Sequence, residues 1–496
     1  MVRTATTIAP SPAGGEVAGE ERPDDHVIVL FGASGDLAAR KLLPGFFHLD
    51  QAGLLPHRYR IVGNADTTYD TENGFHDHVR DALGEFSRVE VSDGDFDAFV
   101  DKISYVPLEA GPDALRDAVE KARRAIGGGR LLHYLAVPPN AFGGIVTMLG
   151  RLGLTGEEAR VILEKPFGHD HDSAVALNET LHAEFDEDQI FRIDHFLGKE
   201  AVQNILALRF ANGLYEPLWN RNNIEFVQID VPETLTVGTR SGFYEGTGAY
   251  RDMVVTHLLQ LLSFIAMEPP AALTAASLRA EKNKVMQAYR MISPDRTVRG
   301  QYEGYRDEPG VGPHSDTETF VAVELEIDNW RWAGVPFYLR TGKAMAESRH
   351  LVALDFREPP MMMFPNEVQH QGANQLVFEL AEPGSITADF QAKVPGPTME
   401  LGPARMIFEY DQSFCADNQL EAYERLIHDA MTGDGTLFTS AEGIERLWSI
   451  SSDVLEHPPE LHEYPKGSWG PAAAGELISP WRWRLPEAHP NPGGDR

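Results

Sequence analysis

The stretch His26-Val-Ile-Val-Leu-Phe-Gly-Ala-Ser-Gly-Asp-Leu-Ala38 decides the fold of this chain. It opens with a short apolar run rich in β-branched residues, which is typical of a buried parallel strand. Gly32 and Gly35 follow this run directly, and a helix-like stretch continues to Phe47. Glycines let the backbone approach a pyrophosphate, and a helix N-terminus offers free N–H groups to it. The pattern Gly-x-x-Gly-x-x-Ala is weak alone, but between a strand and a helix it favours a dinucleotide-binding loop over an ordinary turn.

Further strands and helices alternate on the C-terminal side of this loop. The chain has helical periodicity over 113–126, and apolar runs predict strands over 60–63, 131–137 and 161–166. Strands that alternate with helices over about 190 residues predict a doubly wound, mostly parallel sheet, that is, an α/β Rossmann-like domain.

The pattern changes after residue 200. Several runs alternate apolar and polar residues, which predicts an antiparallel sheet with one covered face. These predicted strands are 225–231, 319–327, 335–340 and 375–380, with helices at about 247–267 and 418–432. We therefore expect an α+β second domain with a large, mainly antiparallel sheet. The expected division is a disordered tail over 1–24, a dinucleotide-binding domain over 25–200, the α+β domain over 201–485, and a disordered tail over 486–496.

Composition limits the possible partners. A chain of 496 residues exceeds what one hydrophobic core usually supports. Its formal net charge of −32 argues against general affinity for nucleic acids or anionic membranes, so a phosphorylated ligand needs a local cluster of basic side chains.

Cys415 is the single cysteine, which excludes an intrachain disulfide and a cysteine-based zinc site and fits a reducing cytoplasm. We expect Cys415 to be a small buried hydrophobe. The sequence contains neither a long apolar run nor a secretory signal, so no membrane segment is expected.

The stretch Arg192-Ile-Asp-His-Phe-Leu-Gly-Lys-Glu200 carries candidate chemistry. It places a carboxylate (Asp194), an imidazole (His195) and an ammonium (Lys199) within nine residues. Beside a dinucleotide site, such groups suggest proton abstraction and hydride transfer on an anionic substrate. Without other motifs, a lysine such as Lys199 is more often a solvated helix residue than a ligand-binding residue. A histidine in an apolar helix, such as His257, is likewise more often a packed core residue than a catalytic one.

Together these motifs resemble those of the glucose-6-phosphate dehydrogenase family. The resemblance rests on the 192–200 stretch, on Gly32-Ala-Ser-Gly-Asp-Leu-Ala-Ala-Arg-Lys-Leu-Leu-Pro44 and on Glu164-Lys-Pro-Phe-Gly168, and it extends over about 26–485. It implies oxidation of D-glucose 6-phosphate at C1 to 6-phospho-D-gluconolactone, with hydride transfer to NAD or NADP, as the first step of the pentose phosphate pathway. It also implies a homodimer or homotetramer in the cytoplasm. The chemistry requires no metal, and no metal-ligand spacing is visible.

The resemblance implies roles for particular residues. His257 matches the general base and Asp194 the carboxylate that orients it; a neutral imidazole can accept the C1 hydroxyl proton near physiological pH. His195 and Lys199 match phosphate ligands, expected to act as cations on one face if their segment is helical. Further implied substrate contacts are Lys165, Glu233, Asp252 and Lys343, and the implied coenzyme contacts are Gly32, Ser34, Gly35, Asp36, Leu37, Arg40, Asp66 and Lys165.

Two positions depart from the family pattern. Asp66 stands where the family usually has an arginine that pairs with the 2′-phosphate of NADP, and an acid there favours NAD over NADP. Against this prediction, Arg40, Thr67 and Thr68 are available to hold the phosphate, and Asp66 could be a turn residue that faces water. Phe196 replaces a common tyrosine and so removes a hydroxyl from the phosphate site, a loss of about 1.5–3 kcal/mol if nothing replaces it.

Two other interpretations remain open at this point. Inositol and glucose–fructose oxidoreductases also combine a Rossmann half with an open sheet, but they lack the 192–200 stretch. A non-enzymatic coenzyme sensor or scaffold predicts the loss of Asp194, Lys199 or His257, and all three are present.

Overall fold

The computed structural model describes residues 22–69, 72–361, 363–364, 374–381, 384–413 and 420–485. Cys415 and most of the two predicted tails lie outside these residues. The chain forms two compact units. The first unit contains residues 1–207 and two segments from later in the chain, 255–287 and 411–452. The second unit contains residues 208–254, 288–410 and 453–496. The domain limits expected from sequence stay predictions.

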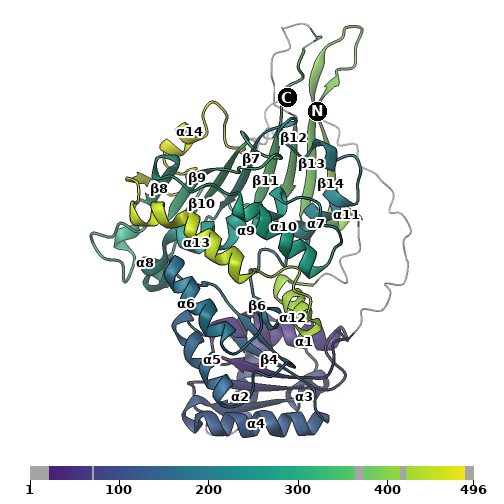
Figure 1. Cartoon of the computed structure of the whole chain (residues 1–496), viewed down its shortest axis with the longest axis vertical. Helices are drawn as coiled ribbons and strands as arrows, with labels where there is room; N and C mark the ends of the chain where they lie inside the picture. Colours follow the sequence, from purple (N-terminus) through teal and green to yellow (C-terminus); the bar gives the residue numbers. More distant parts are fainter. Residues whose placement is uncertain are drawn as a thin grey trace, which may run out of the picture. The chain divides into compact units, whose positions relative to one another are not determined.

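The first unit contains a six-stranded sheet in which every pair of neighbouring strands is parallel (Figure 1). The order is β3-β2-β1-β4-β5-β6, so the direction of winding reverses between β1 and β4. Ligands of such sheets bind beyond the carboxyl ends of the strands at this switch point. This confirms the doubly wound prediction. The strands are β1 (His26–Phe31), β2 (Tyr59–Ala65), β3 (Ile103–Pro107), β4 (Arg130–Leu135), β5 (Ala159–Leu163) and β6 (Ile190–Arg192).

Helices connect these strands. Asp170 caps α6 by accepting from the Ser173 N–H at 2.8 Å, and Gly127 ends α4 in the left-handed conformation. The helices are α1 (Leu43–Gln51), α2 (Glu72–Phe86), α3 (Asp93–Val100), α4 (Gly111–Ile126), α5 (Phe142–Arg151) and α6 (His171–His182); α7 (Glu200–Phe210), α10 (Ala275–Gln287), α12 (Ala422–Thr432) and α13 (Ala441–Glu456) come later in the chain.

The loop after β1 requires glycine. Gly32 has φ +76°, and a Cβ there would lie 2.2 Å from the carbonyl oxygen of Ala136. Its N–H donates to the carbonyl of Asn64 in β2 at 2.7 Å. The predicted helix follows, with a π-helical segment, η1 (Ala38–Leu42), before α1. The switch point therefore carries a tight glycine loop that enters a helix, as the sequence predicts.

The second unit is built on a nine-stranded sheet of order β14-β13-β12-β11-β7-β10-β9-β8-β15. The β7–β10 and β8–β15 pairs are parallel and the other pairs are antiparallel, which confirms a large, mainly antiparallel sheet. The strands are β7 (Ile224–Pro232), β8 (Thr297–Tyr302), β9 (Phe320–Glu326), β10 (Pro336–Gly342), β11 (Leu351–Phe356), β12 (Gln375–Glu379), β13 (Ser385–Lys393), β14 (Leu401–Glu409) and β15 (Leu461–Tyr464), with the short helices α11 (Tyr410–Ser413) and α14 (Ala473–Leu477).

The helix predicted over 247–267 is not one regular helix. It consists of α8 (Ser241–Ala249), the π-helical segment η7 (Tyr250–Leu258) and α9 (Leu259–Ala266). Gly248 breaks the run with φ +67° and ψ 172°, and a Cβ there would lie 2.4 Å from Oε1 of Glu318. π-Helical turns are rare and occur frequently at functional sites. Here the π segment carries His257.

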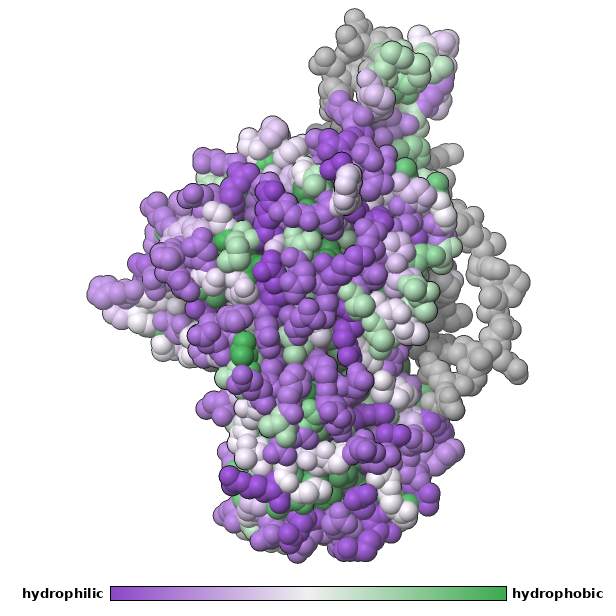
Figure 2. Space-filling view, in the orientation of Figure 1, coloured by the Kyte–Doolittle hydropathy of each residue, from purple (hydrophilic) through white to green (hydrophobic). Residues whose placement is uncertain are grey.

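The face of the molecule in Figure 2 is mainly hydrophilic, as the net charge of −32 leads one to expect. None of the helices in the described part of the chain has the length and apolar character needed to span a lipid bilayer.

A buried ion pair in the second unit should contribute strongly to stability. The Asp230 carboxylate on β7 accepts from Arg340 Nε on β10 at 2.7 Å, and both side chains are buried. Replacing Asp230 with alanine leaves a buried guanidinium without its counter-charge, so we expect unfolding free energy to fall by about 3–5 kcal/mol. Urea denaturation checks this. The control is Glu225→Ala, which breaks the more exposed pair with Arg357 and should cost less than about 1 kcal/mol. Equal losses in both variants would contradict the prediction.

Candidate active site

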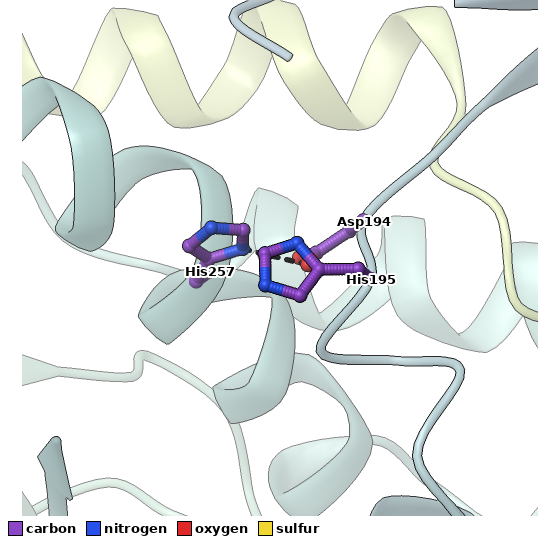
Figure 3. A group of neighbouring side chains, drawn as sticks. All are labelled: Asp194, His195 and His257. Carbon is purple, nitrogen blue, oxygen red and sulfur yellow. Dashed lines mark hydrogen bonds and ion pairs between the residues drawn. The ribbon is translucent and has the colours of Figure 1, made fainter. Parts of the chain in front are cut away.

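A buried acid–base pair forms the centre of the site. Nδ1 of His257, on η7, lies 2.6 Å from Oδ1 of Asp194, which follows β6 by two residues (Figure 3). Both residues are buried and belong to the first unit. A carboxylate at one ring nitrogen fixes the tautomer of the imidazole and stabilises its protonated form. The tertiary structure thus brings together the two residues that the resemblance implies for proton transfer.

The environment keeps Asp194 charged. Burial by itself raises the pKa of Asp194, but His257 beside it, the field of His195 and a hydrogen bond from the Phe196 N–H together hold this pKa below its usual range. The Phe196 N–H donates to Oδ1 at 3.0 Å. Asp194 is therefore ionised at neutral pH, which is the state that a histidine base needs in its partner.

His195 differs from the expectation of a cationic phosphate ligand. Burial, the charge on His257 and the charges of Lys165 and Lys199 lower the pKa of His195 to about 3, against the opposing field of Asp194. Its imidazole is therefore neutral at physiological pH. The ring lies parallel to Tyr423, with centroids 6.0 Å apart, and edge-on to His257 at 5.0 Å. Positive charge at this site comes from the two lysines.

Residues 195–198 form turns, and α7 begins only at Glu200, so His195 and Lys199 are not on a common helix face. Nζ of Lys199 lies 4.8 Å from the centre of the Phe196 ring. That ring is stacked on His257, with centroids 4.4 Å apart and an angle of 23° between the planes. Phe196 therefore forms an apolar wall against the base, at the position where a hydroxyl was expected from the family pattern.

A second buried carboxylate follows β5. Glu164 accepts from the hydroxyl of Tyr134 at 2.6 Å, and Tyr423 also hydrogen-bonds it. Burial raises the pKa of Glu164 to about 7, although Tyr134, Lys165 and Tyr423 oppose this shift. Sequence reasoning did not assign Glu164, Tyr134 or Tyr423 to the site. No spacing along the chain links these three residues, because strand pairing and helix packing bring them together.

The structure also brings together two parts of the predicted coenzyme site. Ser34 Oγ in the glycine loop lies 2.8 Å from Thr67 Oγ1, just after β2. Arg40 Nε donates to Asp36 at 2.6 Å on the exposed surface, so this arginine is already paired with an acid of its own helix. Asp66, next to Thr67, is exposed. The residues expected to offset the negative charge of Asp66 are therefore near it in the chain or the loop, but Arg40 already forms an ion pair with Asp36.

The second unit positions the other predicted substrate residues. Glu233 follows β7 and Lys343 follows β10; these strands are neighbours, and the two side chains form an ion pair. Tyr244 was missed from the sequence. Burial and the charges of Asp252, Glu318, Tyr464 and Glu233 raise its pKa, and Lys343 Nζ lies 6.0 Å from its ring centre. The unit thus places three acids and a lysine near one buried tyrosine.

One group of potential metal ligands coincides with the acid–base pair. Ligand atoms of Asp194, His195 and His257 lie within 4.8 Å of one another, and among the described residues no other three His, Cys, Asp or Glu side chains meet in this way. Two of the three already share the 2.6 Å hydrogen bond. This arrangement matches an orienting carboxylate and its base.

Comparison with known proteins points to one family. The family model for the glucose-6-phosphate dehydrogenase NAD-binding domain matches residues 29–204, and the model for the C-terminal domain matches 206–484. Glucose-6-phosphate 1-dehydrogenase 2 of Mycobacterium tuberculosis is 40% identical, over 92% of this chain and 94% of its own length. The enzyme of Aggregatibacter actinomycetemcomitans is 39% identical, over 94% and 98%.

Solved structures agree. The glucose-6-phosphate 1-dehydrogenase of Mycobacterium avium superposes with a TM-score of 0.83 at 36% sequence identity. A glucose-6-phosphate dehydrogenase in complex with glucose 6-phosphate superposes with a TM-score of 0.86 at 32% identity. Each comparison covers 94% of this chain and 100% of the other chain. Levoglucosan dehydrogenase, at 10% identity and a TM-score of 0.51, shares only the fold. This chain belongs to the glucose-6-phosphate dehydrogenase family.

Proposed function

We propose that this protein is a glucose-6-phosphate 1-dehydrogenase. It oxidises D-glucose 6-phosphate at C1 to 6-phospho-D-gluconolactone and transfers the hydride to a nicotinamide dinucleotide, the first step of the pentose phosphate pathway. The observation that carries this proposal, besides family membership, is the buried hydrogen bond between Asp194 and His257. The test is an assay with glucose 6-phosphate as substrate, in which absorbance measures formation of the reduced nicotinamide dinucleotide. No product with either NAD or NADP would refute it.

The residues of the first unit fit a dinucleotide. Gly32 leaves no room for a side chain, and a helix begins just after Gly35, so backbone N–H groups are available to a pyrophosphate at the switch point. When bound, the nicotinamide ring accepts the hydride. In our proposal His257 removes the C1 hydroxyl proton as that hydride leaves, and Asp194 stabilises the resulting imidazolium.

The substrate phosphate and sugar should be held by separate groups. Lys165 and Lys199 supply positive charge for the phosphate, and neutral His195 supplies a hydrogen bond. Glu233, Asp252 and Lys343 are proposed to bind the sugar hydroxyls. Lys343 and Glu233 already form an ion pair, so each side chain fixes the orientation of the other before the substrate binds.

We propose NAD as the better coenzyme, because the exposed carboxylate of Asp66 disfavours a second phosphate nearby. Replacing Asp66 with arginine should raise kcat/KM for NADP relative to NAD on the order of tenfold or more. Initial rates with each coenzyme measure this ratio. The control is Asp117→Arg on α4, which makes the same charge change at another exposed position. A wild type that prefers NADP would mean that Thr67, Thr68 or Arg40 holds the 2′-phosphate.

We also propose a cytoplasmic homodimer or homotetramer that assembles through the large sheet. Several apolar side chains are exposed on the β13–β14 hairpin, where β14 is the edge strand. Exposed edges and apolar patches favour association with another chain. Light scattering in solution would determine the oligomeric state. The exposed residues are Val394, Met399, Met406 and Ile407, and apolar residues are visible on this hairpin in Figure 2.

A further inference from the structure

A buried lysine of the first unit has no place in the mechanism described so far. Lys282 lies on α10 and is 3% exposed. Its ammonium donates to the backbone carbonyl of Phe438 at 3.2 Å and lies 4.7 Å from the centre of the Phe264 ring. Burying an ammonium is costly unless other groups compensate it. A carbonyl dipole and a ring face compensate partly, but neither is a counter-charge.

The two contacts of Lys282 lead to the two halves of the acid–base pair. Phe264 belongs to the helical run that carries His257, seven residues further along. The Phe438 ring packs edge-on against Phe191 of β6, with centroids 4.8 Å apart. The next residue, Thr439, pairs with Arg192, two residues before Asp194. The ammonium therefore contacts the helical run that carries His257 directly, and it is connected to the segment before Asp194 through Phe438 and Thr439.

Lys282 and Asp194 also interact through their charges. Burial lowers the pKa of Lys282 to about 8, Asp194 opposes this shift, and Arg279 adds to it. The lysine is therefore largely protonated at neutral pH. A cation lowers the proton affinity of nearby groups, and the field of Lys282 reaches Asp194, which is hydrogen-bonded to His257. Three other cations on the surrounding elements have acidic partners: Arg279 pairs with Asp188, Arg192 with Glu187, and Lys284 with Glu281. Glu442 accepts hydrogen bonds from the side-chain amides of Asn283 and Gln287.

We propose that Lys282 is a positioning residue for the dehydrogenase reaction. Its buried ammonium holds the Phe264 and Phe438 segments together and lowers the proton affinity of the Asp194–His257 pair, so that the base is ready to accept a proton at physiological pH. This inference rests on the function proposed above, in which His257 is the base.

The test compares pH profiles of kcat/KM with glucose 6-phosphate. Lys282→Met keeps the length and removes the charge, so the acid limb should move to higher pH by about one unit, with the rate at pH 6 falling by about tenfold. Lys282→Arg retains the charge and should keep the acid limb of the wild type. The matched control is Lys284→Met, two residues along the same helix, whose side chain is 64% exposed and paired with Glu281.

Each outcome decides the inference. A folded Lys282→Met enzyme with the acid limb of the wild type would overturn it, even if its melting temperature falls. If Lys282→Met does not fold, Lys282→Arg decides: the wild-type profile should show a break near pH 8 from the lysine itself, and arginine should remove it. An unchanged break would overturn the inference. Failure of the proposed function would appear differently, as a wild type that does not oxidise glucose 6-phosphate.

Discussion

Replacing His257 with alanine should lower kcat for glucose 6-phosphate oxidation by about a hundredfold to ten thousandfold, the usual contribution of a positioned general base. The imidazole is fully buried and bonded to Asp194, so water cannot simply take its place in the same geometry. KM should change little, because we propose that Lys165, Lys199 and His195, and not His257, bind the phosphate. Steady-state kinetics at pH 7.5 with saturating coenzyme measure both parameters.

Two additional variants sharpen this experiment. His257→Asn retains most of the side-chain volume but not the base, so it should be as impaired as the alanine variant. His182→Ala removes a partly exposed histidine that pairs with Glu187 in the same unit, and its kcat should match the wild type. Added imidazole should restore part of the rate only in His257→Ala. Wild-type turnover in either His257 variant would refute the assignment of the base.

Replacing Asp194 with asparagine should have the second largest effect, a loss in kcat of about a hundredfold to ten thousandfold, as in serine protease triads where the tautomer becomes wrong. The amide cannot carry the charge that Asp194 holds at neutral pH. Without this charge His257 binds a proton less tightly, so the acid limb of kcat/KM should move to lower pH. This direction is opposite to that expected for Lys282→Met.

The control for this prediction is Asp188→Asn, a nearly fully exposed aspartate of the same unit that pairs with Arg279. It should leave kcat and the pH profile unchanged. Tight substrate binding by Asp194→Asn, measured by titration, would show that the loss lies in the chemical step. An acid limb that stays in place would mean that Asp194 orients the imidazole without setting its proton affinity.

Much of the first unit was predictable because its signals are local. The six buried residues of β1 and the constraint at Gly32 act within a few residues, so an apolar run and two glycines suffice to identify them. In the second unit, strands with weak alternation escaped prediction. β13 and β14 are half exposed along most of their length, and pairing with neighbouring strands, more than their own composition, makes them strands.

The site residues divide in the same way. Asp194, His195 and Lys199 stand within one stretch and Asp66 directly follows one strand, so reading the chain was enough to propose them. Tyr134, Tyr423 and Lys282 escaped because nothing in their surroundings along the chain distinguishes them from ordinary core and helix residues. Their hydrogen-bond partners are 30 or more residues away, as for Tyr134 and Glu164.

The sequence by itself determined the family and the glycine loop, and it led us to propose the acid, the base and the lysines, because each stands in a short motif of recognisable residue types. Only the tertiary structure decided their state. Burial makes His195 neutral where a cation was expected, and the π-helical segment after Gly248 places His257 against Asp194. Lys282 lies buried on another helix, and its charge interacts with Asp194. The physical reason is that solvent exclusion and the fields of distant charges set protonation and orientation, and both arise only when remote segments pack together.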